Sequence, residues 1–123
     1  MKVIYIAGKY RGATTWHIEQ NIRAAENVAA LVWSAGLVAL CPHANARHMD
    51  GLASDAHFLA GTLELMRRCD AVLLVAGWEG SIGTRGEVAE AERLSIPVFH
   101  PHEIDYLFAW ARGACHGTAA GAA

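Results

Sequence analysis

The sequence has few of the features that mark secreted, membrane or nucleic-acid-binding proteins. It contains only 3 cysteines, and no pair has the CxxC spacing, so neither a disulfide framework nor a structural zinc site is predicted. The net charge of -2 excludes a broad basic surface for a nucleic acid polymer or an anionic membrane. The first apolar run ends before Lys9 and is too short for a signal peptide or a membrane span. We therefore expect a cytoplasmic protein with no membrane partner.

What the sequence has in quantity is apolar side chains. Hydrophobic residues make up 54% of 123 residues, enough for one packed core and too little chain for two domains. We predict one domain over residues 1–112. Residues 113–123 are mostly small and are expected to form a flexible C-terminal tail.

Short apolar strands alternate with amphipathic helices along this domain. Strands are predicted at residues 2–7, 37–40, 70–76 and 97–99. Helices are predicted from Thr14 or Thr15 to Gly36, from Ser54 or Asp55 to residue 68, from about Thr84 to Leu94, and over residues 104–112, with residues 43–54 as a loop. This pattern predicts an α/β fold: a doubly wound, Rossmann- or flavodoxin-like parallel sheet of four to five strands, ordered 2-1-3-4, with helices on both faces.

Two glycine-rich loops follow the first and third predicted strands. The first reads Gly8-Lys9-Tyr10-Arg11-Gly12, and the second reads Gly80-Ser81-Ile82-Gly83-Thr84-Arg85-Gly86-Glu87. The strand order brings them together at the switch point of the sheet, where such folds bind ligands. Backbone amides, a helix N-terminus and an arginine suit a phosphorylated ligand. Each loop alone is equally well explained as a tight turn with solvated cations.

Glu87 is the one carboxylate in this pair of loops at a predicted helix start. An acid in the first turn stabilises a helix electrostatically even when it has no other role. Cleavage of a ribosyl or deoxyribosyl bond passes through an oxocarbenium-like state, which a carboxylate beneath the sugar can attack or stabilise. Glu87 is therefore a candidate nucleophile.

At these residues the chain resembles the nucleoside 2-deoxyribosyltransferase superfamily. That group includes the 2′-deoxynucleoside 5′-monophosphate N-glycosidases and the small relatives known as the DUF4406 family. The first motif is a strand tyrosine followed by Gly-x-x-Arg-Gly, matched by Tyr5, Gly8, Arg11 and Gly12. The second is Ser-x-Gly-x-x-x-Glu, matched by Ser81, Gly83 and Glu87. The resemblance covers residues 2–99.

The resemblance implies a role for each matched residue. Glu87 would form a glycosyl-enzyme ester and Tyr5 would orient it. The ligand would be a small nucleoside or nucleotide, with no cofactor and no metal, and the protein would be a homodimer or homotetramer whose pockets are completed across the subunit interface. Substrate or phosphate contacts are expected from Gly8, Lys9, Arg11, Gly12, Ser81 and Gly83, and His43 is expected to line the nucleoside pocket.

The chain departs from the family pattern at Thr62. The family's aspartate, which assists the departing base, falls on this threonine, whose hydroxyl is no substitute for a carboxylic acid. Glu79 is a possible replacement, although a solvent-facing loop acid is the more favoured interpretation. Asp70 begins its strand and so belongs to the wrong edge of the sheet.

Three other functions remain open from the sequence. The first is a non-catalytic nucleotide sensor that keeps the loops without the chemistry. The second is a phosphoribohydrolase of the cytokinin-activating type, which the spacing Gly83-Thr84-x-x-Glu87 resembles. The third is a metal-dependent hydrolase, for which suitable side chains occur without a recognised spacing at His43, His48, Asp50, Asp55 and His57.

Overall fold

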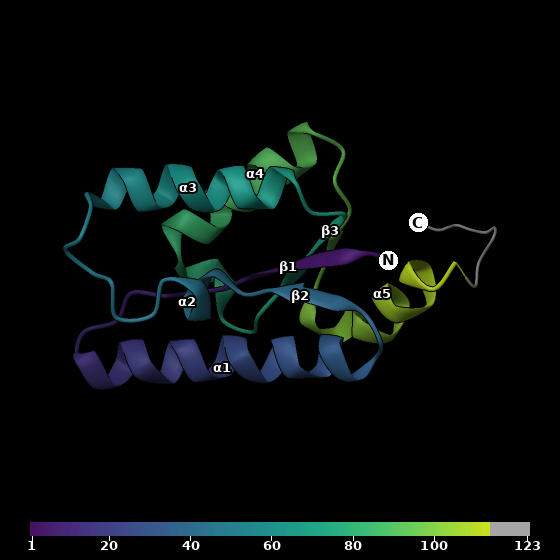
Figure 1. Ribbon diagram of the computed structural model, residues 1–123, viewed down its shortest axis with the longest axis horizontal. Helices are drawn as coiled ribbons and strands as arrows, with labels where there is room; N and C mark the ends of the chain where they lie inside the picture. Colours follow the sequence, from purple (N-terminus) through teal and green to yellow (C-terminus); the bar gives the residue numbers. More distant parts are fainter. Residues whose placement is uncertain (114–123) are drawn as a thin grey trace.

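The computed structural model describes residues 1–113 and confirms the predicted α/β architecture (Figure 1). Its four strands form one parallel sheet in the order β2-β1-β3-β4. The strands are β1 (Val3–Ala7), β2 (Val38–Leu40), β3 (Ala71–Leu74) and β4 (Val98–Phe99). The helices are α1 (Thr15–Ser34), α2 (Pro42–Asn45), α3 (Asp55–Arg67), α4 (Ile82–Arg93) and α5 (Ile104–Ala111), with 3-10 turns at Trp78–Gly80 and Pro101–Glu103. The tail predicted beyond residue 113 lies outside the described residues.

The helices cover both faces of the sheet, as Figure 1 shows, with α1 and α5 on one side and α3 and α4 on the other. Alternation along β1 separates the two cores. Ile4 and Ile6 pack with α1 and α5, whereas Tyr5 and Ala7 pack with α3 and α4. Tyr5 is thereby a fully buried residue that faces the α3–α4 layer. Among residues 1–113, no helix combines the length and the apolar character that a bilayer span requires.

Side-chain oxygens cap the three long helices that begin near the carboxyl edge of the sheet. Thr14 caps α1 and Ser54 caps α3, as predicted, each accepting a hydrogen bond from a backbone amide three residues on. The predicted start of α4 near Thr84 was wrong. Ser81 is the cap, its hydroxyl accepts from the amide of Thr84 at 3.1 Å, and the helix begins at Ile82. Glu87 therefore lies in the second turn of α4, beyond the first turn where a helix dipole acts most strongly.

A short helix occupies part of the segment that was predicted to be a loop. Pro42 stands at the first helical position of α2, where its fixed backbone angle suits a helix start and its missing N–H leaves nothing unpaired. The sequence pattern predicts a strand that ends before this proline and a loop from residue 43, so this turn of helix was not expected. Because α2 follows β2 directly, His43 is held at the carboxyl edge of the sheet.

Close packing explains two glycines of the first loop. A Cβ atom at Gly8 would lie 2.8 Å from the Cβ of Val75, which immediately follows β3. A Cβ atom at Gly12 would lie 2.6 Å from the Cβ of His17 on α1. Both distances are below van der Waals contact, so any larger side chain would push the loop away from the sheet or from α1. These glycines hold the loop in place over the end of the sheet.

Candidate active site

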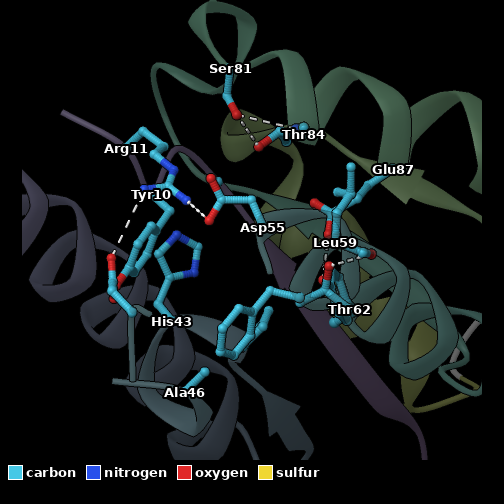
Figure 2. A pocket seen from close by; sticks show the side chains of 16 residues that line it. Tyr10, Arg11, His43, Ala46, Asp55, Leu59, Thr62, Ser81, Thr84 and Glu87 are labelled. Atoms are coloured by element: carbon cyan, nitrogen blue, oxygen red, sulfur yellow. Dashed lines mark hydrogen bonds and ion pairs between the residues drawn. The ribbon is translucent and has the colours of Figure 1, made fainter. Parts of the chain in front are cut away.

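A cavity of about 290 Å³ opens at the carboxyl edge of the sheet. Figure 2 shows side chains from β1, the first loop, α2, α3 and α4 converging on it. The volume is at the small end of the ~300–1,000 Å³ range of ligand pockets and suits a nucleoside-sized molecule. The lining residues are Tyr5, Gly8, Tyr10, Arg11, Pro42, His43, Ala46, Asp50, Asp55, Phe58, Leu59, Thr62, Ser81, Gly83, Thr84 and Glu87.

Glu87 and Tyr5 form a buried pair within this cavity. The phenol of Tyr5 donates a hydrogen bond of 2.5 Å to Oε2 of Glu87. Tyr5 is 0% exposed and Glu87 is 7% exposed, so little water reaches either group. The tyrosine comes from the central strand and the glutamate from α4, which fixes the carboxylate between two rigid elements. The hydrogen bond from Tyr5 thus holds Oε2 of a carboxylate that lines the cavity.

Burial controls the ionisation of this pair. Desolvation raises the pKa of Glu87 to about 7, against smaller opposing effects of hydrogen bonds from Tyr5 and Thr62. Burial, and then the nearby Glu87 carboxylate, raise the pKa of Tyr5 far above its ordinary range. The phenol therefore stays a donor, and Glu87 changes charge close to neutral pH. A carboxylate with this behaviour in a cavity is typical of a catalytic group.

We expect Tyr5→Phe to move the pH dependence of any Glu87-dependent activity upward. In the wild type, the hydrogen bond from Tyr5 stabilises the charged carboxylate by roughly 1.5–3 kcal/mol. Its removal should therefore raise the pKa of Glu87 by about one to two units. The midpoint of kcat/KM against pH should shift from about 7 in the wild type to a higher value. An unchanged midpoint in the variant would show that the phenol does not act on Glu87. Circular dichroism of the variant checks that its fold is retained.

Thr62 lies beside the pair on α3. Its hydroxyl donates to the carbonyl of Leu59 at 3.0 Å, the usual arrangement of a helical threonine. The same side chain also favours the charged form of Glu87. Thr62, where the resemblance implies an aspartate, is therefore a side chain that hydrogen-bonds without being an acid.

The cavity mouth is closed on one side by a group of four polar residues. Arg11 pairs with Asp55 through Nη2 and Oδ1 at 2.6 Å, and it approaches Asp50 at 4.0 Å. The hydroxyl of Tyr10 donates to Asp50 at 2.5 Å. Figure 2 shows Tyr10, Arg11 and Asp55 on the side of the cavity away from Glu87. The charge of Arg11, which was predicted to meet a phosphate, is compensated here by carboxylates.

His43 is a buried wall of the cavity. Its Nε2 lies 2.9 Å from the carbonyl oxygen of Lys9, and because a carbonyl only accepts, Nε2 carries the proton. Burial lowers the pKa of the imidazole, so the ring is neutral. Its Nδ1 is buried without a hydrogen-bond partner. His43 is therefore a neutral side chain whose single N–H is already used.

The structure brings most of the predicted site residues together. Tyr5, Gly8, Arg11, His43, Ser81, Gly83 and Glu87 all line the cavity. Lys9 and Gly12 do not: Lys9 is exposed, and Gly12 packs against His17. Within residues 1–113, no three His, Cys, Asp or Glu side chains are grouped so as to hold a metal ion.

Glu79 and Asp70, the two other candidate acids, do not line the cavity. Glu79 is exposed in the turn before α4 and does not line the cavity. Asp70 accepts a hydrogen bond from the amide of Val3 at 2.7 Å, at the opposite edge of the sheet, as expected. Sequence reasoning missed Tyr10, Asp50 and Asp55 as a connected group, because no local pattern relates residues about 40 positions apart.

One solved structure has a fold similar to that of this chain. No curated protein matches the chain. A solved structure described as "2-desoxiribosyltransferase from Leishmania mexicana" matches with a TM-score of 0.58 and 25% sequence identity. The match covers 81% of this chain and 63% of the other, so this chain spans less than two thirds of that protein.

The family comparison gives a different description from the one that the motifs predicted. A family model matches residues 2–100, almost the same span as the resemblance, and its description is "Domain of unknown function (DUF7768)". This family is not the DUF4406 family that the motifs predicted. The chain belongs to the DUF7768 family.

Proposed function

We propose that this protein cleaves or transfers the N-glycosidic bond of a nucleoside or deoxynucleoside, with Glu87 as the nucleophile. The observation that carries the proposal is the buried carboxylate of Glu87, held by Tyr5 at 2.5 Å inside a nucleoside-sized cavity. The similarity to a deoxyribosyltransferase supports the same chemistry.

The geometry suits attack on the anomeric carbon. Ionised Glu87 would bond to C1′ through one carboxylate oxygen while the base departs, which gives a glycosyl ester. Water would then release the sugar, or a second base would take it up. Tyr5 keeps its proton throughout and fixes the direction of the carboxylate. Closure of the pocket around the sugar would keep the developing positive charge close to the carboxylate.

The phosphate contacts expected from the resemblance to the DUF4406 relatives and the monophosphate N-glycosidases remain a prediction. Ser81 and Gly83 line the cavity at the start of α4, where an anion would be stabilised. Against this, the hydroxyl of Ser81 already caps the helix, and Arg11 already faces two carboxylates. Comparison of free nucleosides with their 5′-monophosphates decides the matter.

A panel of ribo- and deoxyribonucleosides, with and without a 5′-phosphate, tests the proposed function. Released base is measured by chromatography, alone and with a second base as acceptor. We expect release of base from at least one member, and transfer if the acceptor competes with water. Ligand-induced stabilisation without release of any base would favour the nucleotide sensor instead.

The cavity mouth also favours the predicted homodimer or homotetramer. Exposed apolar side chains flank residues that line the cavity: Met49 and Leu52 stand beside Asp50 in the chain, and Ile82 stands beside Ser81. Leu52 is 79% and Ile82 is 80% exposed, values that a second copy covering the mouth would reduce.

A further inference from the structure

The charged groups of the cavity are mainly acidic. Within residues 1–113, Arg11 is the one cation that lines the cavity, against the carboxyl groups of Asp50, Asp55 and Glu87. Lys9, in the same loop as Arg11, is exposed and does not line the cavity. Since Arg11 is already paired with Asp55 at 2.6 Å, the cavity as a whole presents negative charge to a ligand.

Among the described residues, the cavity lining also offers no side chain with an acidic proton free to protonate a departing base. A neutral base leaves poorly as an anion, so its departure ordinarily needs an acid within hydrogen-bond reach. Asp50 and Asp55 accept hydrogen bonds or ion pairs from Tyr10 and Arg11. The N–H of His43 is bonded to a carbonyl, and Thr62 is an alcohol bonded to another. Glu87 itself is committed as the nucleophile.

One kind of substrate fits both the acidic lining of the cavity and its lack of a free acid. We propose that the cavity takes a nucleoside whose base is already a cation, a ribosyl or deoxyribosyl pyridinium-type N-glycoside. This inference rests on the proposed function and specifies its substrate class. Such a base needs no proton to leave, and its positive charge is complementary to the carboxylates around it.

The step balances without a further reactant. A lone pair of the Glu87 carboxylate forms the new bond to C1′, and the pair of the broken C1′–N⁺ bond passes to the ring nitrogen. The base departs as a neutral heteroarene. The negative charge of the carboxylate and the positive charge of the pyridinium cancel, so the ester is neutral as well. Water then attacks the ester, giving the free sugar, the carboxylate and one proton.

The aromatic wall of the cavity suits the same ligand. Tyr10 and Phe58 both line it, and Tyr10 stands next to His43 with ring centroids 5.8 Å apart. A flat cationic ring is attracted to the face of an aromatic side chain, and more strongly where the ring is shielded from water. Stacking there would place the charge near Asp50, which the Tyr10 hydroxyl already contacts.

The test compares ribosyl nicotinamide, a pyridinium nucleoside, with adenosine and cytidine and with their 2′-deoxy forms. Each kcat/KM is divided by the uncatalysed rate, because the pyridinium bond is intrinsically weaker. We expect Glu87-dependent release of nicotinamide, favoured about 100-fold or more over the neutral bases after this correction, the size of a typical acid-catalysis term. Glu87-dependent cleavage of the neutral nucleosides to an equal degree would overturn the inference and leave the proposed function intact. No cleavage of any of them would overturn both.

Two variants sharpen the comparison. Thr62→Asp restores an acid beside Glu87, so it should raise turnover of the neutral nucleosides and narrow the preference about 10-fold or more. Thr62→Asn introduces a side chain with the shape of aspartate but without the acid. It should leave the preference for the pyridinium nucleoside unchanged. Asp55→Asn, at an exposed position, should raise KM for the pyridinium nucleoside about 5-fold relative to adenosine. An unchanged preference in both Thr62→Asp and Asp55→Asn would contradict the proposed substrate class.

Discussion

A Glu87→Gln protein should lose at least ~10³-fold in kcat/KM for N-glycosidic bond cleavage while it keeps its fold. The amide has nearly the shape of the carboxylate and still accepts the hydrogen bond from Tyr5, so packing around the 7% exposed side chain is preserved. It lacks the negative charge that would attack C1′ or stabilise the oxocarbenium-like state. Activity is measured with whichever nucleoside the panel identifies.

Glu92→Gln is the matched control for this loss. Glu92 lies on the same helix as Glu87 and carries the same change of charge, but it is exposed and does not line the cavity. It should retain activity within about 2-fold. Equal losses in both variants would point to a general effect of charge on the protein, and full activity in Glu87→Gln would remove Glu87 from the chemistry.

The second large effect expected of Glu87→Gln is on stability. The substitution should lower activity but raise the free energy of unfolding at neutral pH. The folded protein raises the pKa of Glu87 from 4.5 to about 7, so the folded state binds this proton more tightly than the unfolded chain does. The stabilisation that the protonated side chain brings is present below about pH 4.5 and is lost as pH rises toward 7. A shift of this size corresponds to about 3 kcal/mol, the cost of keeping the buried carboxylate charged.

Glu87→Gln should therefore be increasingly more stable than the wild type as pH rises. The difference in the free energy of unfolding should grow by up to about 3 kcal/mol between pH 4.5 and pH 8 and then level off. Urea unfolding of both proteins across this pH range gives the difference directly. Parallel curves would show that Glu87 is not desolvated in solution. Because the charged Glu87 lowers the free energy of unfolding at neutral pH, its presence is better explained by a functional role than by a contribution to folding.

The sheet and much of the site follow from local sequence patterns. The uninterrupted apolar run of residues 71–75 predicts a central parallel strand, and the alternation of strands and helices predicts the order 2-1-3-4, which β2-β1-β3-β4 confirms. The switch-point rule then places the loops after β1 and β3 together. Glu87 was expected at this edge on that ground, whereas Tyr5 was expected beside it from the family resemblance, and their hydrogen bond is observed.

The remaining features depend on competition between local signals or on distant contacts. The helix α4 was expected from about Thr84, but the cap at Ser81 starts it at Ile82 and takes Gly83 and Gly86 into the helix despite their low helix propensity. The group of Tyr10, Arg11, Asp50 and Asp55 joins two segments through side chains alone. No periodicity or motif records that group, and it is what gives the cavity its acidic mouth.

Trapping of the sugar on the enzyme tests the central role of Glu87 most directly. A nucleoside with fluorine in place of the 2′-hydroxyl slows both steps, so the ester should accumulate and survive an acid quench. We predict a mass increase equal to one fluorinated sugar, located on the peptide that contains Glu87 and absent from Glu87→Gln. Release of base from the same nucleoside with no adduct on that peptide, at a rate that Glu87→Gln matches, would contradict it.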